Sequence, residues 1–249
     1  MPNVGIRFHT YEFGDKITGW QRRQAFVLNA AEIPRRDGQV IRGGKLGIKE
    51  YEVRGTLVGD TPDEVRTQFD AMMAVLANRT ANLYLLDDRY TEARLVGYTD
   101  SYPDGSALGV LDFILTFQSS LPYELSETLQ SQSYTTISVN AETFNVTNNG
   151  NYDAFVKITV TAPGSAITAD CQINNLTTSD SFSYLGTISA TKKLIVNSFS
   201  VPFTVYNDGT SDIANYSGAI IKLSPGVNAI QIESVLGANI LMEWRDTYV

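Results

Sequence analysis

Reactive side chains are scarce in this sequence of 249 residues, which contains one cysteine and one histidine. The single thiol, Cys171, excludes a disulfide within the chain and a zinc site built from cysteines. Cys171 falls in the alternating segment 167–173, which favours an ordinary strand residue. The single imidazole, His9, cannot form a histidine metal cluster, and a surface or strand position is favoured over a catalytic one. We therefore expect no metal, no cofactor and no enzymatic activity.

Charged residues make up 18% of the chain, and the net charge is −8. This balance argues against non-specific nucleic-acid binding, because neutralising phosphates takes a basic surface. Two arginine pairs, at 22–23 and 35–36, are too few for such a patch and fit contacts with partners or sister subunits better. The apolar run 71–77 is far too short to cross a membrane, so no membrane insertion is expected. Residues 1–6 lack signal-peptide features, which favours synthesis in a cytoplasm without an export signal.

Two sequence patterns suggest possible catalytic sites. The glycine-rich segment 38–45 has the wrong spacing for a phosphate loop, and Leu46 stands where a magnesium-binding Ser or Thr is needed. A glycosidase requires only two carboxylates across a sugar, and Asp87, Asp88 and Glu92 form the nearest cluster. A hairpin turn with solvated acids is the favoured interpretation of that cluster.

Aromatic residues in the second half of the chain suggest a possible carbohydrate-binding surface. An exposed set of rings can stack on sugars, although such rings more often alternate into a sandwich core. The four candidates for a platform are Trp244, Tyr184, Tyr206 and Tyr216.

The firmest local prediction is a strand, a capped helix and a second strand between residues 48 and 86. Thr61 and Glu64 have the spacing of a capping box, and Pro62 occupies the first helical position. A helix over about 61–78 follows, because apolar residues recur there at intervals of three and four. These residues are Val65, Phe69, Met72, Met73 and Leu76.

The surrounding segments predict strands and turns. Short strands are expected at 6–8 and 25–28, and a long strand at 92–102. A further strand is expected at 108–117, with alternate residues forming a strongly apolar face. A flexible segment is expected at 43–47. Turns are predicted at 34–38, 87–90 and 103–105.

The composition changes after residue 118, where segment 119–135 has the character of a linker. Beyond it, eight or nine short strands separated by turns favour a β-sandwich or jelly roll without helices. These strands are expected at 144–146, 154–161, 166–173, 182–188, 193–196, 201–206, 219–223, 228–233 and 239–244. The fold class is therefore mainly β, with one helix and a β-hairpin in a sandwich-like first domain. We place the domains at 1–125 and 126–249.

Two sets of motifs resemble a known family. The first set runs from Ile33-Pro34-Arg35-Arg36-Asp37-Gly38 through Gly43-Gly44 and 51–61 to 83–90. The second set consists of 148–151, 173–175, 223–228 and 240–246. Their succession is similar to the distal tail proteins of bacteriophages with long non-contractile (siphovirus-type) tails, which carry a galectin-like C-terminal sandwich.

The resemblance implies a structural virion protein at the distal end of the tail, made in the host bacterial cytoplasm. Residues 1–125 would form a homohexameric ring around a channel through which DNA passes as cargo. Residues 126–249 would be the galectin-like domain. The expected partners are sister copies, the tail tube protein and tail-associated or receptor-binding proteins. An unpaired strand edge at 113–117 would be covered by ring closure. No catalytic or ligand-binding residues carry over from the family.

Two alternatives remain beside this hub hypothesis. One is a carbohydrate-binding adhesin module of the tail tip, for which Trp244 is the test residue. The other is a tail-associated glycosidase using Asp87, Asp88 or Glu92.

Overall fold

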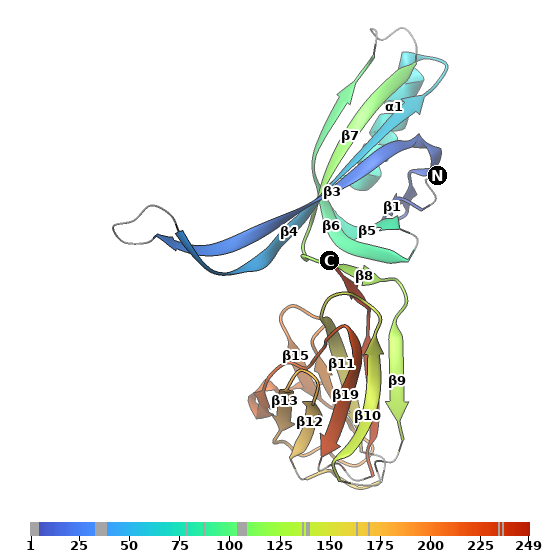
Figure 1. Ribbon diagram of the computed structural model, residues 1–249. Coiled ribbons are helices and arrows are strands. Elements are labelled where there is room, and N and C mark those ends of the chain that lie inside the picture. Colours follow the sequence, from blue (N-terminus) through green and yellow to red (C-terminus); the bar gives the residue numbers. More distant parts are fainter. Residues whose placement is uncertain are drawn as a thin grey trace. The chain divides into compact units, whose positions relative to one another are not determined.

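The computed structural model describes the chain except for residues 1–4, 33–38, 78, 87, 104–108, 136, 138, 139, 163, 169, 234 and 236, and at 29–32 and 39–42 it describes the backbone alone. The chain divides into two compact units, Met1–Glu124 and Leu125–Val249. The paired strands are antiparallel within each unit (Figure 1), so the predicted mainly β fold is confirmed.

Unit 1 is a single sheet with a helix on one face. Its elements are β1 (Arg7–Phe8), β2 (Tyr11–Glu12), the 3-10 helix η1 (Gly14–Lys16), β3 (Ile17–Glu32), β4 (Gln39–Val58), α1 (Pro62–Leu76), β5 (Thr80–Leu86), β6 (Arg89–Ser101) and β7 (Val110–Ser119). The strand order is β2-β1-β5-β6-β7-β4-β3. Helix α1 packs against β7 and β4.

The predicted helix is present and begins as expected. The Thr61 side chain accepts a hydrogen bond from the Glu64 N–H at 3.2 Å, and the Glu64 carboxylate accepts one from the Asp60 N–H at 2.9 Å. These bonds satisfy donors that the first helical turn leaves free. Of the predicted stripe, Met73 is partly buried and the other four residues are buried.

Strand β7 supplies the centre of the unit 1 core. Leu111, Phe113, Leu115 and Phe117 are all buried on one face, as the alternation predicts. The expectation that 113–117 form an unpaired edge is wrong, because β7 pairs with β4 on one side and β6 on the other. Its apolar face is covered within the unit, so no ring closure is needed to protect it.

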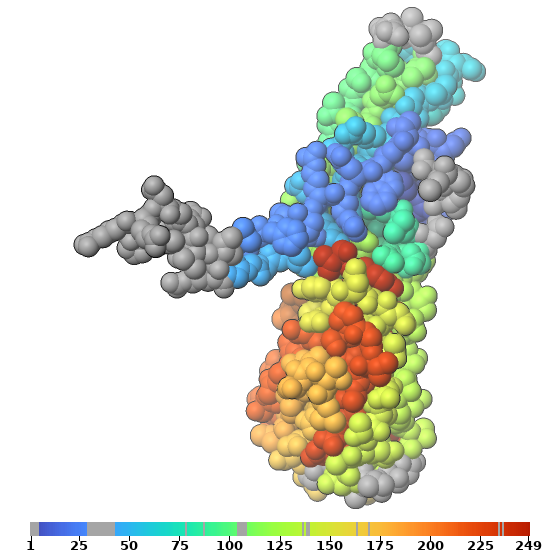
Figure 2. All heavy atoms as spheres, viewed as in Figure 1, coloured from blue at the N-terminus to red at the C-terminus, as the bar shows by residue number. Residues whose placement is uncertain are grey.

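Strands β3 and β4 continue beyond the sheet as a two-stranded arm. β4 pairs with β7 from Glu50 to Val58, whereas its pairing with β3 continues to Gln39. Figure 1 shows this hairpin extending away from the rest of unit 1, and Figure 2 shows its described part as a thin blue projection. We call β3 residues 24–28 and β4 residues 43–48 the arm.

The strand predicted at 25–28 is present, within a strand of 16 residues. The segment predicted to be flexible, 43–47, instead lies within a strand of 20 residues. Pairing between the two segments supplies backbone hydrogen bonds that neither segment alone predicts. The predicted turn at 34–38, together with Ile33, lies outside the described residues, as do Asp87 of the turn at 87–90 and Asp104 and Gly105 of the turn at 103–105.

The predicted linker at 119–135 is also incorrect in part. It contains β8 (Glu124–Ser126), which spans the boundary between the units, and β9 (Gln130–Tyr134), which pairs with β20 in unit 2. The polar composition of β9 reflects an edge strand whose serines are exposed.

Unit 2 is a sandwich of two antiparallel sheets. Its remaining elements are β10 (Glu142–Asn148), β11 (Ala154–Thr161), β12 (Cys171–Asn175), β13 (Asp180–Tyr184), β14 (Lys193–Asn197), β15 (Thr204–Asn207), β16 (Thr210–Ser211), the 3-10 helix η2 (Ile213–Asn215), β17 (Tyr216–Gly218), β18 (Lys222–Leu223), β19 (Gly226–Glu233), β20 (Asn239–Trp244) and β21 (Thr247–Tyr248). One sheet has the order β10-β19-β12-β13-β17, and the other has the order β16-β15-β14-β11-β20-β9.

The sandwich agrees with its prediction in class and differs in detail. The strand expected at 166–173 begins only at Cys171, because Ile167 forms an isolated bridge with Ile188. The region around 213–215 forms the short η2, which the expectation of strands and turns alone missed. Inward-facing aliphatic and aromatic side chains of both sheets make one continuous core.

Candidate functional site

The arm exposes an apolar face. Phe26 pairs with Leu46 and Leu28 pairs with Gly44, so Phe26, Leu28 and Leu46 lie on the same side of the hairpin. A register shift between the pairs Gln24–Lys49 and Phe26–Leu46 interrupts the alternation of β4 at residues 47 and 48, so Ile48 does not share this side. The exposed fractions are 68% for Phe26 and 57% for Leu28. Large apolar side chains exposed together in this way are typical of an interaction surface.

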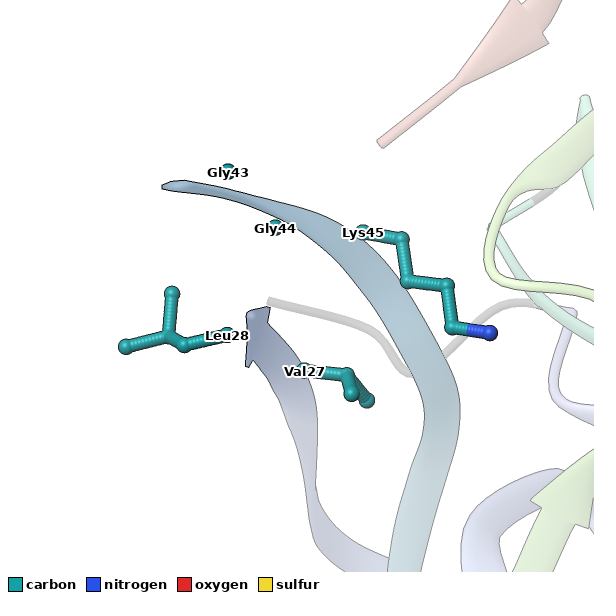
Figure 3. A pocket seen from close by; sticks show the side chains of 5 residues that line it. All are labelled: Val27, Leu28, Gly43, Gly44 and Lys45. Atoms are coloured by element: carbon teal, nitrogen blue, oxygen red, sulfur yellow. The ribbon is translucent and has the colours of Figure 1, made fainter. Parts of the chain in front are cut away.

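Figure 3 shows how the two faces of the arm differ. Val27 and Lys45 pair across the strands and point to one side, whereas Leu28 points to the other. A shallow, open hollow of about 470 Å³ is lined by Val27, Leu28, Gly43, Gly44 and Lys45. A Cβ atom at Gly44 would lie 3.2 Å from Leu28 Cδ2, so glycine lets Leu28 lie across the neighbouring strand. This lining offers apolar contact and one ammonium group, with no nucleophile or acid–base pair.

Two of the four aromatic residues considered for a sugar-stacking platform lie in the sandwich core, the interpretation that the sequence favoured. Trp244 is 5% exposed and Tyr184 is fully buried, and both belong to the sandwich core. Each alternates inward along its strand, which is why neither faces solvent. Tyr206 is exposed, while Tyr216 is partly buried and its ring packs on Phe182 and Phe203.

Burial also holds the polar ends of these core residues in their neutral forms. Tyr184 donates a hydrogen bond of 2.5 Å to Asp212 Oδ2 and accepts one of 2.8 Å from Asn207 Nδ2. Burial and the bond to Asp212 raise the pKa of Tyr184 to about 12. Burial likewise raises the pKa of Tyr216 to about 12. These groups act as fixed hydrogen-bond partners of the fold.

The acidic cluster considered for a glycosidase consists of turn and surface residues in its described part. Asp88 is exposed and lies 3.7 Å from Arg89 in the loop between β5 and β6. Glu92 is exposed and accepts a hydrogen bond from Ser120 Oγ at 3.1 Å. Asp87 lies outside the described residues. Among the residues described, neither Asp88 nor Glu92 is a buried carboxylate, so this part of the cluster does not form an enclosed acidic site.

The structure also shows where the single cysteine, the single histidine and the first arginine pair lie. Cys171 is buried in β12, as predicted, and burial raises the pKa of its thiol to about 12. His9 is exposed in the turn after β1. Arg22 forms an ion pair with Glu124 within its own unit, and Arg23 is largely exposed. The second arginine pair lies outside the described residues.

In the parts of the chain that the structure describes, no group of three or more His, Cys, Asp or Glu side chains is arranged to hold a metal ion. None of the described helices is both long enough and apolar enough to cross a membrane.

Sequence reasoning missed the arm surface. Its signal is the apolar alternation of Phe26 and Leu28, followed by Leu46 beyond the predicted turn at 34–38. The glycines at 43, 44 and 47 obscured the second strand, because glycine weakens the usual signal for a strand.

Comparison with solved structures finds the same fold in a class of bacteriophage proteins, those of the adsorption apparatus. The particular structure is the crystal structure of the SPP1 Dit (gp 19.1) protein, described as a paradigm of the hub adsorption apparatus in phages that infect Gram-positive bacteria. The two chains are 17% identical, the match covers 98% of each, and the TM-score is 0.76. At this identity the likeness establishes a shared fold, and the resemblance to distal tail proteins is confirmed at that level.

A weaker likeness is to a chain of a phage baseplate. The structure of the phage p2 baseplate in its activated conformation with Sr matches with 9% identity, a TM-score of 0.46, and coverage of 92% of this chain and 90% of the other. A score this low supports no statement about the present chain. No protein-family model and no curated protein matches the sequence.

Proposed function

We propose that this protein is a structural component of a phage tail tip, a hub that acts through assembly and not through catalysis. The observation that carries the proposal is the likeness to SPP1 Dit, which extends through both units and covers 98% of each chain. A shared fold does not by itself fix function, so a feature of the chain itself must also fit. The arm is that feature.

In an isolated monomer the arm leaves apolar side chains exposed to water, which is unfavourable. Its face of Phe26, Leu28 and Leu46 lies on a hairpin that the rest of the sheet does not cover. Burying one such side chain stabilises a contact by about 1.5–3 kcal/mol. A closed ring of sister copies gives every arm the same neighbour, so all copies gain the contact equally.

In the proposed ring, six copies surround a channel for DNA and join the tail tube protein to tail-associated or receptor-binding proteins. The net charge of −8 is compatible with DNA passing through the ring without binding to it, because a negatively charged surface repels phosphate. The virion is the proposed location, at the distal end of the tail.

The test is the mass and shape of the full-length protein. Native mass spectrometry should detect six copies of the 27.4 kDa chain, about 164 kDa, and electron microscopy should show an annulus with an open centre. Immunogold labelling should place the protein at the tail tip of intact particles. A protein that stays monomeric at high concentration and is missing from the virion annulus would refute the proposal.

The carbohydrate-binding alternative is weakened, because Trp244 and Tyr184 are buried and cannot stack on a sugar at the surface. The glycosidase alternative retains only an exposed turn. Neither is favoured by a specific observation.

A further inference from the structure

The root of the arm contains a buried ionic cluster. Strand β4 leaves β7 at Glu50, and the preceding residue, Lys49, has a side chain that is only 1% exposed. Arg22 on β3 lies opposite Tyr51 on β4, one step inside the sheet. Three polar side chains therefore gather where a sheet of several strands narrows to two.

All three converge on one carboxylate oxygen, Oε1 of Glu124. Arg22 Nη1 donates to it at 2.9 Å, and the Tyr51 hydroxyl donates to it at 3.1 Å. Lys49 Nζ lies 3.6 Å away, within ion-pair range and too long for a good hydrogen bond. The Glu124 side chain is 7% exposed. We call Arg22, Lys49, Tyr51 and Glu124 the clamp.

The clamp joins segments that are distant along the chain. Glu124 is the last residue of unit 1, about a hundred residues after Arg22 and 73 residues after Tyr51. Burial lowers the pKa of Lys49, and the neighbouring Glu124 opposes that effect. Burial, reinforced by Glu124, raises the pKa of Tyr51 and keeps the phenol a donor. The buried ammonium of Lys49 depends on Glu124, because without that carboxylate its charge would be uncompensated, whereas Glu124 is also paired with Arg22.

We propose that Glu124 is a positioning residue that fixes the root of the arm, tying β3 and β4 to the end of unit 1 so that the arm leaves the sheet in one direction. Its use in assembly depends on the proposed function, since a fixed arm loses less conformational freedom when it meets a neighbouring copy. Its effect on the arm itself is independent of any ring.

Hydrogen exchange of the full-length chain, kept dilute enough to remain unassembled, tests the clamp. In Glu124→Gln, amides of residues 18–28 and 44–51 should exchange at least about tenfold faster, while α1 and unit 2 keep their protection. The double variant Glu124→Gln with Lys49→Met removes both buried charges and should recover most of the protection. The matched control is Glu52→Gln, which breaks an exposed pair with Arg54 on the same strand and should leave the arm unchanged.

Several outcomes would refute the clamp. These are an unchanged arm in Glu124→Gln, equal acceleration in α1 and the arm, and a double variant no better protected than the single one. Should Glu124→Gln fail to fold, Tyr51→Phe removes one donor without changing charge and should accelerate exchange of the same segments several-fold; no acceleration would contradict the proposal. A ring that forms while exchange is unaffected would leave the proposed function standing and remove this inference alone.

Discussion

At the residue scale, Cys171 makes a measurable contribution to the pH dependence of stability. Its pKa is raised from 9.0 to about 12 in the folded chain, so above pH 9 the unfolded chain loses a proton that the folded chain keeps. The contribution is therefore complete below pH 9 and is lost between pH 9 and about 12. The slope approaches about 1.4 kcal/mol per pH unit within that window.

Urea unfolding of unit 2 at a series of pH values checks this effect. We expect the free energy of unfolding to fall more steeply from pH 9 upward in the wild type than in Cys171→Val, by close to one proton. Tyr184 and Tyr216 contribute a further decline to both proteins, because their pKa values are also raised. Parallel curves for the two proteins would show that the thiol ionises equally in both states.

Substitution of Trp244 distinguishes a role in the sandwich core from a role in ligand binding. Because its side chain fills the sandwich core, Trp244→Ala should lower the free energy of unfolding by about 3–5 kcal/mol, measured by urea titration. The matched aromatic Tyr206→Ala removes an exposed ring and should cost less than about 1 kcal/mol. Glycan binding that depends on Trp244 in a variant of unchanged stability would reverse this assignment.

At the scale of single elements, α1 depends on its first turn. Thr61→Ala removes the side-chain acceptor for the Glu64 N–H and should lower the free energy of unfolding by about 1 kcal/mol. Thr67→Ala is the control on the same helix, because its hydroxyl bonds only back to the Asp63 carbonyl; the expected change is within about 0.5 kcal/mol. Equal losses in chemical denaturation would show that the cap contributes nothing special.

Elements defined by local signals were predictable, and those defined by distant pairing were not. Helix α1 carries its cap and its apolar stripe within 16 consecutive residues, 61–76, so the sequence alone identifies it. The arm exists because β3 pairs with β4 beyond the reach of β7, and no local pattern encodes that length. The clamp was invisible for the same reason, since Glu124 lies about a hundred residues from Arg22. The predicted edge at 113–117 was wrong because, besides the preceding strand β6, β7 pairs with the distant strand β4.

The arm should contribute to assembly more than to folding. In the double variant Phe26→Ser with Leu28→Ser, the concentration needed for half-assembly should rise at least tenfold, as measured by light scattering after size exclusion. Its stability as a monomer should change little, because both side chains are already exposed. Val58→Ser with Val96→Ser alters two exposed valines outside the arm and should assemble as the wild type does. Equal weakening by both pairs would point to non-specific stickiness.

At the scale of the whole molecule, the two units have separate cores. The core of unit 1 draws on residues between Ile6 and Phe117, and the core of unit 2 draws on residues between Ile137 and Trp244. A unit that closes its own core around a complete set of strands has the means to fold alone. The division at residues 124 and 125 therefore predicts that the parts can be separated and their contributions to assembly compared.

Residues 125–249 produced alone should fold, remain monomeric, and retain the loss of stability from pH 9 upward that Cys171 confers. Assembly should be absent from this fragment, because the arm with its exposed Phe26 and Leu28 belongs to residues 1–124. Circular dichroism, urea unfolding at two pH values and native mass spectrometry measure the three properties. A fragment that forms six-membered particles would move the assembly surface into the sandwich, and an unfolded one would show that its core depends on unit 1. A monomeric, folded fragment beside an assembling full chain would locate the ring contacts in the unit that carries the arm.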